Sequence, residues 1–315
     1  MSEINLGIIG AGGIAKEHLK VIHSLRTVNL IGITSRTLSK AEELAKTFHI
    51  QNIYNSVDDL TNKCALDGVL VLVSADQIYN VAKKLLPLGV PTFLEKPPGI
   101  LLNETQSLAE LADKHGTKNM VGYNRRYYSI FHKGQKIIEN EGNLLGLEVE
   151  GHERFWRIAD RSITQKVIEN WIYVNSTHTI DLLRFFGGEV ENINTLTKRI
   201  KEKKGDQFVA SMEFKSGSLG TYRSHWYSPG GWSVTLFGNG VTVKYKPLEK
   251  GVYIDTNLKE HQMLPDQVDI KFKPGFYRQM ENFISLIRTG SLNHPGVDLS
   301  DSIMTMRLAE MFVHA

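Results

Sequence analysis

The sequence predicts an α/β domain followed by an α+β domain with a large, mainly antiparallel open sheet. Three observations predict this arrangement. The chain has 315 residues, more than a single hydrophobic core usually organises. Short apolar runs alternate with helical patterns as far as residue 122. From residue 123 onward the strand-like stretches are longer and alternate between apolar and polar residues.

The first domain, residues 1–122, is predicted to contain a parallel sheet. Its expected strands cover residues 4–9, 28–34, 69–73, 91–94 and 118–121. Its expected helices cover residues 13–25, 38–48, 78–88 and 103–115. Short strands that alternate with helices are typical of a parallel sheet with helices on both faces.

The second domain, residues 123–315, is predicted to contain an antiparallel sheet and some helices. Asn239-Gly240 lies inside an alternating stretch and is a strong signal for a two-residue hairpin turn. A second turn is expected at residues 216–218. Helices are expected near residues 175–186, 277–288 and 300–313.

The composition argues against several classes of protein. Hydrophobic residues make up 41% of the chain and charged residues 23%, which is ordinary for a globular protein. The formal net charge is +3, and the basic residues are scattered apart from one run at 198–204. That run has no interleaved aromatic residues, so we expect a solvated loop and no nucleic-acid partner.

Cysteine and histidine usage adds further expectations. The single cysteine, Cys64, cannot form an intramolecular disulfide, which fits a reducing compartment. The sequence shows neither a signal-peptide pattern nor an apolar stretch of about 18 residues. We therefore expect a cytoplasmic protein with no membrane partner. The eleven histidines show no H-x-x-H or H-E-x-x-H spacing, so no metal site is expected.

A glycine-rich segment follows the first predicted strand and begins a predicted helix. Residues 10–15 read Gly-Ala-Gly-Gly-Ile-Ala, which fits the G-x-G-x-x-A pattern of dinucleotide-binding loops. Gly10 permits a tight turn, Gly12 lets the backbone approach a pyrophosphate, and Ala15 lets the helix pack closely. The alternative is a plain turn that needs small residues only for packing.

The end of the second predicted strand bears on which dinucleotide binds. NAD sites usually place Asp or Glu there to bond the ribose hydroxyls. This chain has Ser35-Arg36-Thr37 instead, with Lys40 nearby. A guanidinium can bind a 2′-phosphate with two bonds, so we expect NADP. The alternative is NAD, with Arg36 stacking on adenine.

Residues 93–99, Phe-Leu-Glu-Lys-Pro-Pro-Gly, place a charged pair after a buried strand. Charges at such a position are costly unless they have partners or a function. The carboxyl ends of parallel strands are where ligands bind in open α/β sheets. Lys96 is therefore predicted to reach both the nicotinamide ribose and a substrate hydroxyl. The alternative is a salt-bridged lysine on a loop.

Taken together, these motifs resemble the Gfo/Idh/MocA oxidoreductase family over nearly the whole chain. The matching segments are the glycine loop and residues 95–97, 121–126, 178–183 and 277–290. The resemblance implies an N-terminal Rossmann domain and a C-terminal domain whose open sheet mediates a homodimer or homotetramer. It also implies NAD(P)-dependent chemistry at a hydroxyl or keto carbon of a cyclitol, sugar or sugar derivative, nucleotide sugars included.

The resemblance also implies roles for individual residues. Lys96 and His178 are the expected catalytic residues. A base near neutral pH must take the hydroxyl proton as hydride leaves, which suits histidine, and a lysine cation would stabilise alkoxide character. The expected cofactor-binding residues are Gly10, Ala11, Gly12, Gly13, Ile14, Ser35, Arg36, Thr37, Lys40, Ser74, Ala75, Glu95, Lys96 and Asn124.

The chain departs from the family pattern near the histidine. The family often has Asp four residues earlier, where this chain has Val174, followed by Asn175. Asp181, one turn after His178, can orient the histidine or form a structural hydrogen bond. Ser74-Ala75 stands where the family has Thr-Pro, and Tyr79 where it usually has histidine.

Aromatic and arginine residues cluster at the start of the second domain. Aromatic faces pack on sugar rings, and arginine binds carboxylate or phosphate. Strand alternation would place Arg154 and Trp156 on one face and Phe155 on the other. The residues expected to contact substrate are Lys96, Arg126, Arg154, Trp171, Asn175, His178 and Asp181.

Two other functions compete with the oxidoreductase. A non-catalytic NAD(P)-binding regulator can share the fold, and Val174 favours it, whereas Lys96 and His178 favour the enzyme. A glycosidase that uses bound NAD as a transient oxidant is a known variation of the family. Arg36 and the missing acidic residue argue against that variation.

Overall fold

The computed structural model describes residues 3–158 and 163–315 of the chain. They divide into two compact units, and the first is built from two separate stretches of sequence. It combines the N-terminal part up to Asn124 with Lys271–Ile303. The second unit combines Arg125–Ile270 with Met304–Ala315.

The first unit contains a parallel sheet, as predicted, but with six strands where five were expected, because the two-residue strand β3 was not predicted. Its strands are β1 (Ile4–Ile9), β2 (Val28–Thr34), β3 (Ile53–Tyr54), β4 (Gly68–Val71), β5 (Thr92–Leu94) and β6 (Asn119–Val121). They are ordered β3-β2-β1-β4-β5-β6. The strand order reverses between β1 and β4, and ligands of doubly wound sheets bind at such a reversal.

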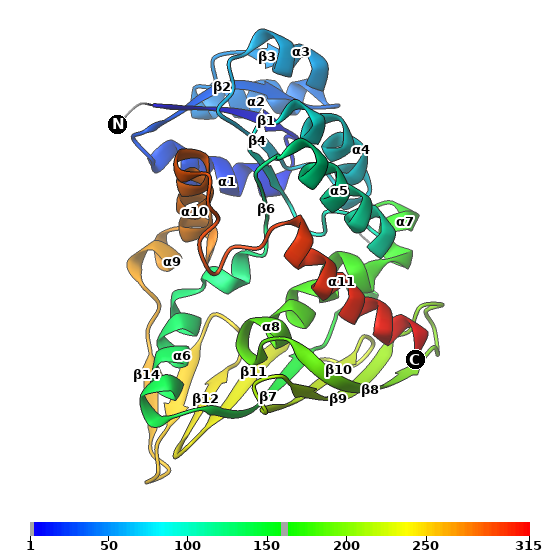
Figure 1. The fold of residues 1–315 in the computed structure, drawn as a ribbon, viewed down its shortest axis with the longest axis vertical. Helices are drawn as coiled ribbons and strands as arrows, with labels where there is room; N and C mark the ends of the chain where they lie inside the picture. The colour runs from blue at the N-terminus through cyan, green and yellow to red at the C-terminus, as the bar shows by residue number, and fades with distance from the viewer. Residues whose placement is uncertain (1–2, 159–162) are drawn as a thin grey trace. The chain divides into compact units, whose positions relative to one another are not determined.

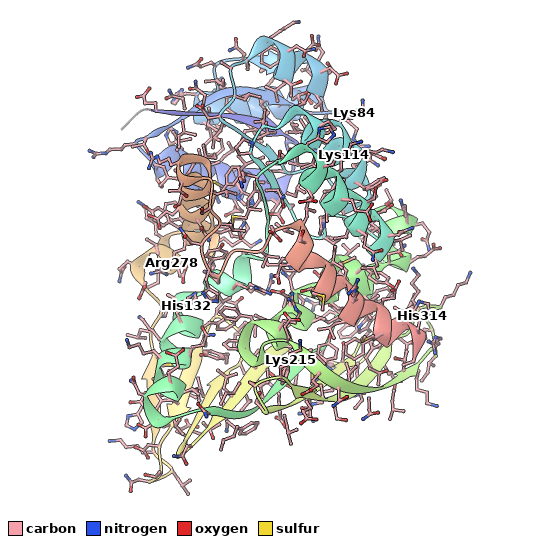
Figure 2. All side chains as sticks on the ribbon, in the orientation of Figure 1. Lys84, Lys114, His132, Lys215, Arg278 and His314 are labelled. Carbon is pink, nitrogen blue, oxygen red and sulfur yellow. The ribbon has the colours of Figure 1, made fainter. Side chains whose placement is uncertain are left out.

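Helices cover both faces of this sheet. They are α1 (Gly13–Ser24), α2 (Leu38–Phe48), α3 (Val57–Lys63), α4 (Ala75–Leu85), α5 (Leu102–His115) and α10 (Phe276–Thr289). Helices α1 and α10 lie on one face, and α4 and α5 on the other (Figure 1). Lys84 in the last turn of α4 and Lys114 in the last turn of α5 are exposed (Figure 2). Lysines there complement the negative ends of the helix dipoles.

After the second unit's sheet, the chain returns to the first unit over Lys271–Ile303. This return differs from the predicted division into residues 1–122 and 123–315. The backbone of Val121 pairs with Val297 in an isolated bridge. The Asn124 amide donates to the Pro274 carbonyl at 3.1 Å. Periodicity shows that α10 is a helix, but it does not show which sheet the helix covers.

The second unit contains an eight-stranded, mainly antiparallel sheet, again as predicted. Its strands are β7 (Leu144–Gly151), β8 (Val190–Lys198), β9 (Gln207–Phe214), β10 (Leu219–His225), β11 (Trp232–Gly238), β12 (Val241–Tyr245), β13 (Gly251–Ile254) and β14 (Glu260–Met263). Their order is β14-β13-β12-β11-β7-β10-β9-β8. Strands β7 and β10 are parallel. The hairpin turns predicted at Asn239-Gly240 and at 216–218 are both confirmed.

Helices also belong to the second unit, and some of them cover one face of its sheet. The helices are α6 (Ser129–Glu141), α7 (Gln165–Glu169), α8 (Thr177–Gly187), the short α9 (Gln267–Lys271), which ends at the boundary with the first unit, and α11 (Leu299–His314), whose first residues belong to the first unit. Helices α6 and α8 lie against the sheet in Figure 1. Strands β9 and β10 alternate between buried and exposed residues, so this sheet has a second, uncovered face.

The expected strand alternation at residues 154–156 is wrong. Strand β7 ends at Gly151, and Phe155–Arg157 form a 3-10 turn instead. The Phe155 amide donates to the Trp226 carbonyl at 3.1 Å, and its ring stacks on Trp226 at a centroid distance of 4.9 Å. Burial of this ring against a neighbouring indole therefore overrides the local alternation.

Within the described ranges, the helices are too short or too polar to cross a bilayer.

Candidate active site

The glycine loop has the geometry that a dinucleotide-binding turn requires. Gly10 donates its N–H to the Thr34 carbonyl at 2.8 Å and has a φ of 112°, which side chains disfavour. A Cβ at Gly10 would lie 2.4 Å from the Leu72 carbonyl oxygen. Residue 10 must therefore be glycine for the turn to form.

Gly12 and Gly13 are open where Gly10 is crowded. A Cβ at either position would meet no atom within 4 Å among the residues that the structure describes. Gly12 is the N-cap of α1, and the described first turn of that helix carries no acidic residue and no side-chain cap. The open space and the helix N–H groups fit a pyrophosphate, which these residues would hold. Ala11 and Ile14 flank them and are half-buried.

The end of β2 presents the residues predicted to bind the ribose. Arg36, Thr37 and Lys40 are exposed, and the Thr37 amide donates to the Ser35 hydroxyl at 3.3 Å. Asp76, which sequence reasoning missed, is the nearby carboxyl. Burial raises its pKa, but hydrogen bonds from Ser74 and Gln77 and the charge of Arg36 outweigh burial and lower it below the ordinary value. Arg36 therefore has an ionised neighbour.

The charged pair after β5 has a buried partner that sequence reasoning also missed. His18 of α1 is fully buried, and its Nε2 lies 2.7 Å from Glu95 Oε1. The His18 ring packs on Phe93 at a centroid distance of 5.1 Å and on Phe276 at 4.6 Å. His18 shares the buried stripe of α1 with Ala15, Leu19 and Ile22. A polar residue on such a stripe needs a partner, and that was the available signal.

Glu95 in turn contacts the catalytic candidate. Its second carboxylate oxygen accepts from the Lys96 backbone N–H at 3.3 Å, and Lys96 is half-buried. The Gly122 amide donates to the Leu94 carbonyl at 2.8 Å, and a Cβ at Gly122 would lie 3.3 Å from the Glu95 carboxyl group. The strand end that carries Lys96 is therefore fixed by α1 on one side and by β6 on the other.

The remaining cofactor candidates occupy the same sheet edge. Ser74 is the N-cap of α4, and Ala75 is the first residue of that helix. Asn124 is buried and bonds the Pro274 carbonyl, as described above.

The second unit contains a cavity of about 330 Å³ at one end of its sheet. The cavity has aromatic walls and polar groups, which is typical of small-molecule sites. Its lining residues are His152, Glu153, Arg154, Arg157, Ile158, Trp171, Asn175, Gly231, Trp232, Pro247, Leu248 and Glu249.

A buried carboxylate organises one wall of this cavity. Both oxygens of Glu153 accept from the Asn175 amide nitrogen, at 3.1 and 2.8 Å. The Ser176 hydroxyl donates to Glu153 at 3.0 Å. Because the Asn175 nitrogen faces Glu153, its carbonyl oxygen is the end directed away from that carboxylate. This wall was not predicted, since Glu153 and Asn175 lie on different elements.

His178 is the second residue of α8 and follows closely after Asn175 and Ser176 of this wall. It is 8% exposed, and its ring centroid is 5.8 Å from that of Trp232, which lines the cavity. A π-helical turn, Ile172–Ser176, directly precedes α8. Such a turn holds an extra residue, so α-helical spacing does not relate Val174 to His178.

Arg126 and Asp181 bind each other. Arg126 Nε and Nη2 donate to the two Asp181 oxygens at 2.7 and 2.8 Å. Asp181 also accepts from the Thr305 hydroxyl at 2.9 Å. Neither residue is among those that line the cavity, whereas Arg154, Trp171 and Asn175 are.

Within residues 3–158 and 163–315, no group of three or more His, Cys, Asp or Glu residues is placed to hold a metal ion.

Comparison with protein families matches both parts of the chain. Residues 4–123 match the oxidoreductase family with an NAD-binding Rossmann fold, and residues 136–315 match the C-terminal alpha/beta domain of the same family. The chain belongs to the Gfo/Idh/MocA oxidoreductase family. The predicted resemblance is therefore confirmed.

Individual members of the Gfo/Idh/MocA family show the range of similarity. Glucose-6-phosphate 3-dehydrogenase of Bacillus subtilis is 30% identical over 148 residues, which cover 46% of this chain and 41% of that protein. The scyllo-inositol 2-dehydrogenase (NAD(+)) of the same organism is 19% identical, and the match covers 91% of this chain and 87% of that protein. The structure of UDP-N-acetylglucosamine 3-dehydrogenase from Acidithiobacillus ferrooxidans matches with a TM-score of 0.80 at 18% identity, covering 100% and 98%. The last likeness shows the fold alone.

Substitutions in the glycine loop separate folding from cofactor binding. Gly10→Ala forces a Cβ into a backbone carbonyl at a positive φ and should destabilise the protein by about 3 kcal/mol. Gly12→Ala meets open space, so thermal unfolding should stay close to wild type while the NADH dissociation constant rises at least tenfold. Thermal melts and NADH fluorescence titrations measure the two effects. Unweakened NADH binding by Gly12→Ala would contradict this placement of the pyrophosphate.

The buried pair gives a second prediction. Asp181→Asn removes the carboxylate charge that the buried Arg126 guanidinium binds through two nitrogens and should lower the free energy of unfolding by about 3 kcal/mol. Glu17→Gln, which breaks the exposed Lys20–Glu17 pair, should change it by less than about 1 kcal/mol. Urea unfolding measures both. If Asp181→Asn unfolded like wild type but lost activity, a substrate role for Asp181 would replace the structural one.

Proposed function

We propose that this chain is an NAD(P)-dependent oxidoreductase acting on a hydroxyl or keto carbon of a cyclitol, a sugar or a sugar derivative such as a nucleotide sugar. The observation that carries the proposal is the His18–Glu95 hydrogen bond behind Lys96, at the ligand-binding edge of the NAD-binding sheet. A buried polar pair at that edge is costly to build, and fixing Lys96 is the function we assign to it.

The chain's own residues would transfer the proton and bind the substrate. When bound, the cofactor supplies or accepts the hydride at its nicotinamide ring. In the oxidation direction His178 takes the substrate hydroxyl proton, because imidazole titrates near neutral pH. The Lys96 ammonium group stabilises negative charge on the substrate oxygen. Both roles follow the family resemblance.

The cavity supports a carbohydrate-like substrate. The indoles of Trp171 and Trp232 can pack on the apolar faces of a sugar ring, and the Asn175 carbonyl can accept from a hydroxyl. The three relatives named above act, by their names, on a sugar phosphate, a cyclitol and a nucleotide sugar. The regulator alternative is supported only by Val174, and the π-helical turn weakens that support.

We propose NADP rather than NAD as the preferred cofactor. Arg36 and Lys40 are exposed at the end of β2, where a 2′-phosphate would lie. The Asp76 carboxylate would compete with the 2′-phosphate for Arg36, because it interacts with that guanidinium group.

We further propose that the uncovered face of the second sheet joins copies of the chain into a homodimer or homotetramer. Leu196, Val209 and Leu219 on this face are 74%, 44% and 64% exposed. Apolar side chains gathered on one sheet face mark an interaction surface.

One enzyme assay tests the function. The purified protein is titrated with NADPH and NADH and then screened with sugars, sugar phosphates, nucleotide sugars and cyclitols for a change in nicotinamide absorbance. We expect tighter NADPH binding, and Arg36→Ala should weaken NADPH at least tenfold while changing NADH less than threefold. NADH binding tenfold tighter than NADPH in the wild type would overturn the cofactor assignment.

The same assay tests the catalytic residues. Lys96→Ala and His178→Ala should each lower kcat by a factor of about 100 or more, because each removes a group that acts on the reacting oxygen. Lys84→Ala, an exposed lysine at the end of α4, is the control and should leave kcat unchanged. Full turnover by Lys96→Ala on a genuine substrate would show that the assignment is wrong.

The oligomer proposal has its own measurement. Light scattering after size exclusion should give a mass two or four times 35.5 kDa for the wild type. Leu196→Lys with Val209→Lys should lower that mass, because lysines would have to be buried in the interface. Leu258→Lys, at a leucine between β13 and β14 that is 84% exposed, is the control. A monomeric wild type would refute the proposal.

A further inference from the structure

The 3-10 turn after β7 brings two arginines to the same cavity. The Arg157 amide donates to the Arg154 carbonyl at 2.8 Å, which closes the turn. Side chains three residues apart eclipse one another in 3-10 geometry, so Arg154 and Arg157 project from one side of the turn. Both line the cavity of the second unit. A continuing strand would have placed them on opposite faces.

These two arginines differ from other arginines of the unit. Arg126 is paired with Asp181, Arg184 with Glu189 and Arg223 with Glu150. Arg154 and Arg157 are exposed and make no side-chain hydrogen bond or ion pair with any residue in the described ranges. Two like charges on one turn repel each other, so an anion between them would be stabilised.

The acidic residues of the cavity have partners of their own. Glu153 accepts from Asn175 and Ser176. Glu249 accepts from the Tyr128 hydroxyl at 3.3 Å, and burial, together with Glu249, raises the pKa of Tyr128 to about 12, so the hydroxyl stays protonated. Within the described ranges, neither carboxylate forms a hydrogen bond or ion pair with Arg154 or Arg157.

A second observation points independently to a ligand. Trp171 is 8% exposed and lines the cavity, yet its indole Nε1 has no hydrogen-bond partner among the described residues. A buried donor without a partner costs about 1–3 kcal/mol, which a ligand oxygen would offset. Burial also lowers the pKa of His152, despite the nearby Glu150, so this lining residue is neutral at pH 7. The positive charge therefore comes from the two arginines.

We propose that the substrate carries an anionic group, a phosphate or a carboxylate, which Arg154 and Arg157 bind together. This inference rests on the proposed function, in which the cavity is the substrate site. Guanidinium groups match phosphate and carboxylate oxygens with paired, charge-assisted hydrogen bonds. Trp171 and Asn175 contact the uncharged part of the same molecule. A neutral sugar or cyclitol would leave both guanidinium groups without an anion.

Equilibrium binding tests this inference without requiring turnover. The full chain, saturated with oxidised cofactor, is titrated by calorimetry with glucose 6-phosphate, glucuronate, inorganic phosphate and glucose. We expect an anionic probe to bind at least tenfold tighter than glucose. The phosphate and carboxylate probes show which anion is preferred. Glucose binding as tightly as the anions, or binding of none of the four probes, would overturn the proposal.

Single substitutions locate the anion site. Arg154→Ala and Arg157→Ala should each weaken the anionic probe at least tenfold, the factor expected for loss of about 1.5 kcal/mol from a charged hydrogen bond. Arg307→Ala, an exposed arginine on α11 with the same change in charge, is the control and should bind as wild type does. Far-ultraviolet circular dichroism checks that each variant is folded. Equal affinities in all three variants would place the anion elsewhere and refute the proposal.

The outcome is separable from that of the proposed function. An enzyme that oxidises neutral sugars with no preference for anions would refute the anion site and leave the oxidoreductase intact. Tight anion binding that depends on Arg154, with no hydride transfer in the assay above, would support the anion site and refute the catalytic assignment.

Discussion

The first unit depends on one buried hydrogen bond, that between His18 and Glu95. It joins the helix that follows the glycine loop to the strand that carries Lys96, so two segments 77 residues apart are held at one sheet edge. A buried carboxylate is stable only with good partners, and Glu95 has the imidazole on one oxygen and the Lys96 amide on the other. Aromatic rings around His18 exclude water from the bond and thereby strengthen it.

The sequence was sufficient for the fold and for the residues that act through the backbone. Gly10 and Gly12 were predicted because the turn, the pyrophosphate and the helix impose requirements on a few adjacent residues. The two sheets were predicted because short apolar runs between helices differ from longer stretches that alternate between apolar and polar residues. The contacts of His18 and Glu153 were missed because their partners lie on other elements. Arg157 was missed because a continuing strand was expected in place of the turn that sets it beside Arg154. The alternation expected at residues 154–156 failed because burial of Phe155 against Trp226 outweighs it.

The second unit builds its polar wall in a way that spacing along one helix cannot reveal. The carboxylate next to Asn175 and Ser176 comes from Glu153, which lies just beyond β7. A π-helical turn before α8 shifts the residues around His178 relative to a regular helix. π-Helical turns recur at functional sites because they redirect side chains at little cost to neighbouring turns. This wall therefore has a carboxylate, that of Glu153, although residue 174 is valine.

The two-part construction of the first unit sets an order of events during synthesis. Domains generally fold as units while the chain emerges from the ribosome. When Asn124 has emerged, all six parallel strands exist, but α10 has not been made. The ring of Phe276, which packs on His18, is still absent, as is Ile287, whose side chain reaches Gly68 in β4. The face of the nucleotide-binding sheet that carries α1 is therefore only partly covered until the second sheet has been synthesised, and the packing around His18 is completed only when α10 arrives.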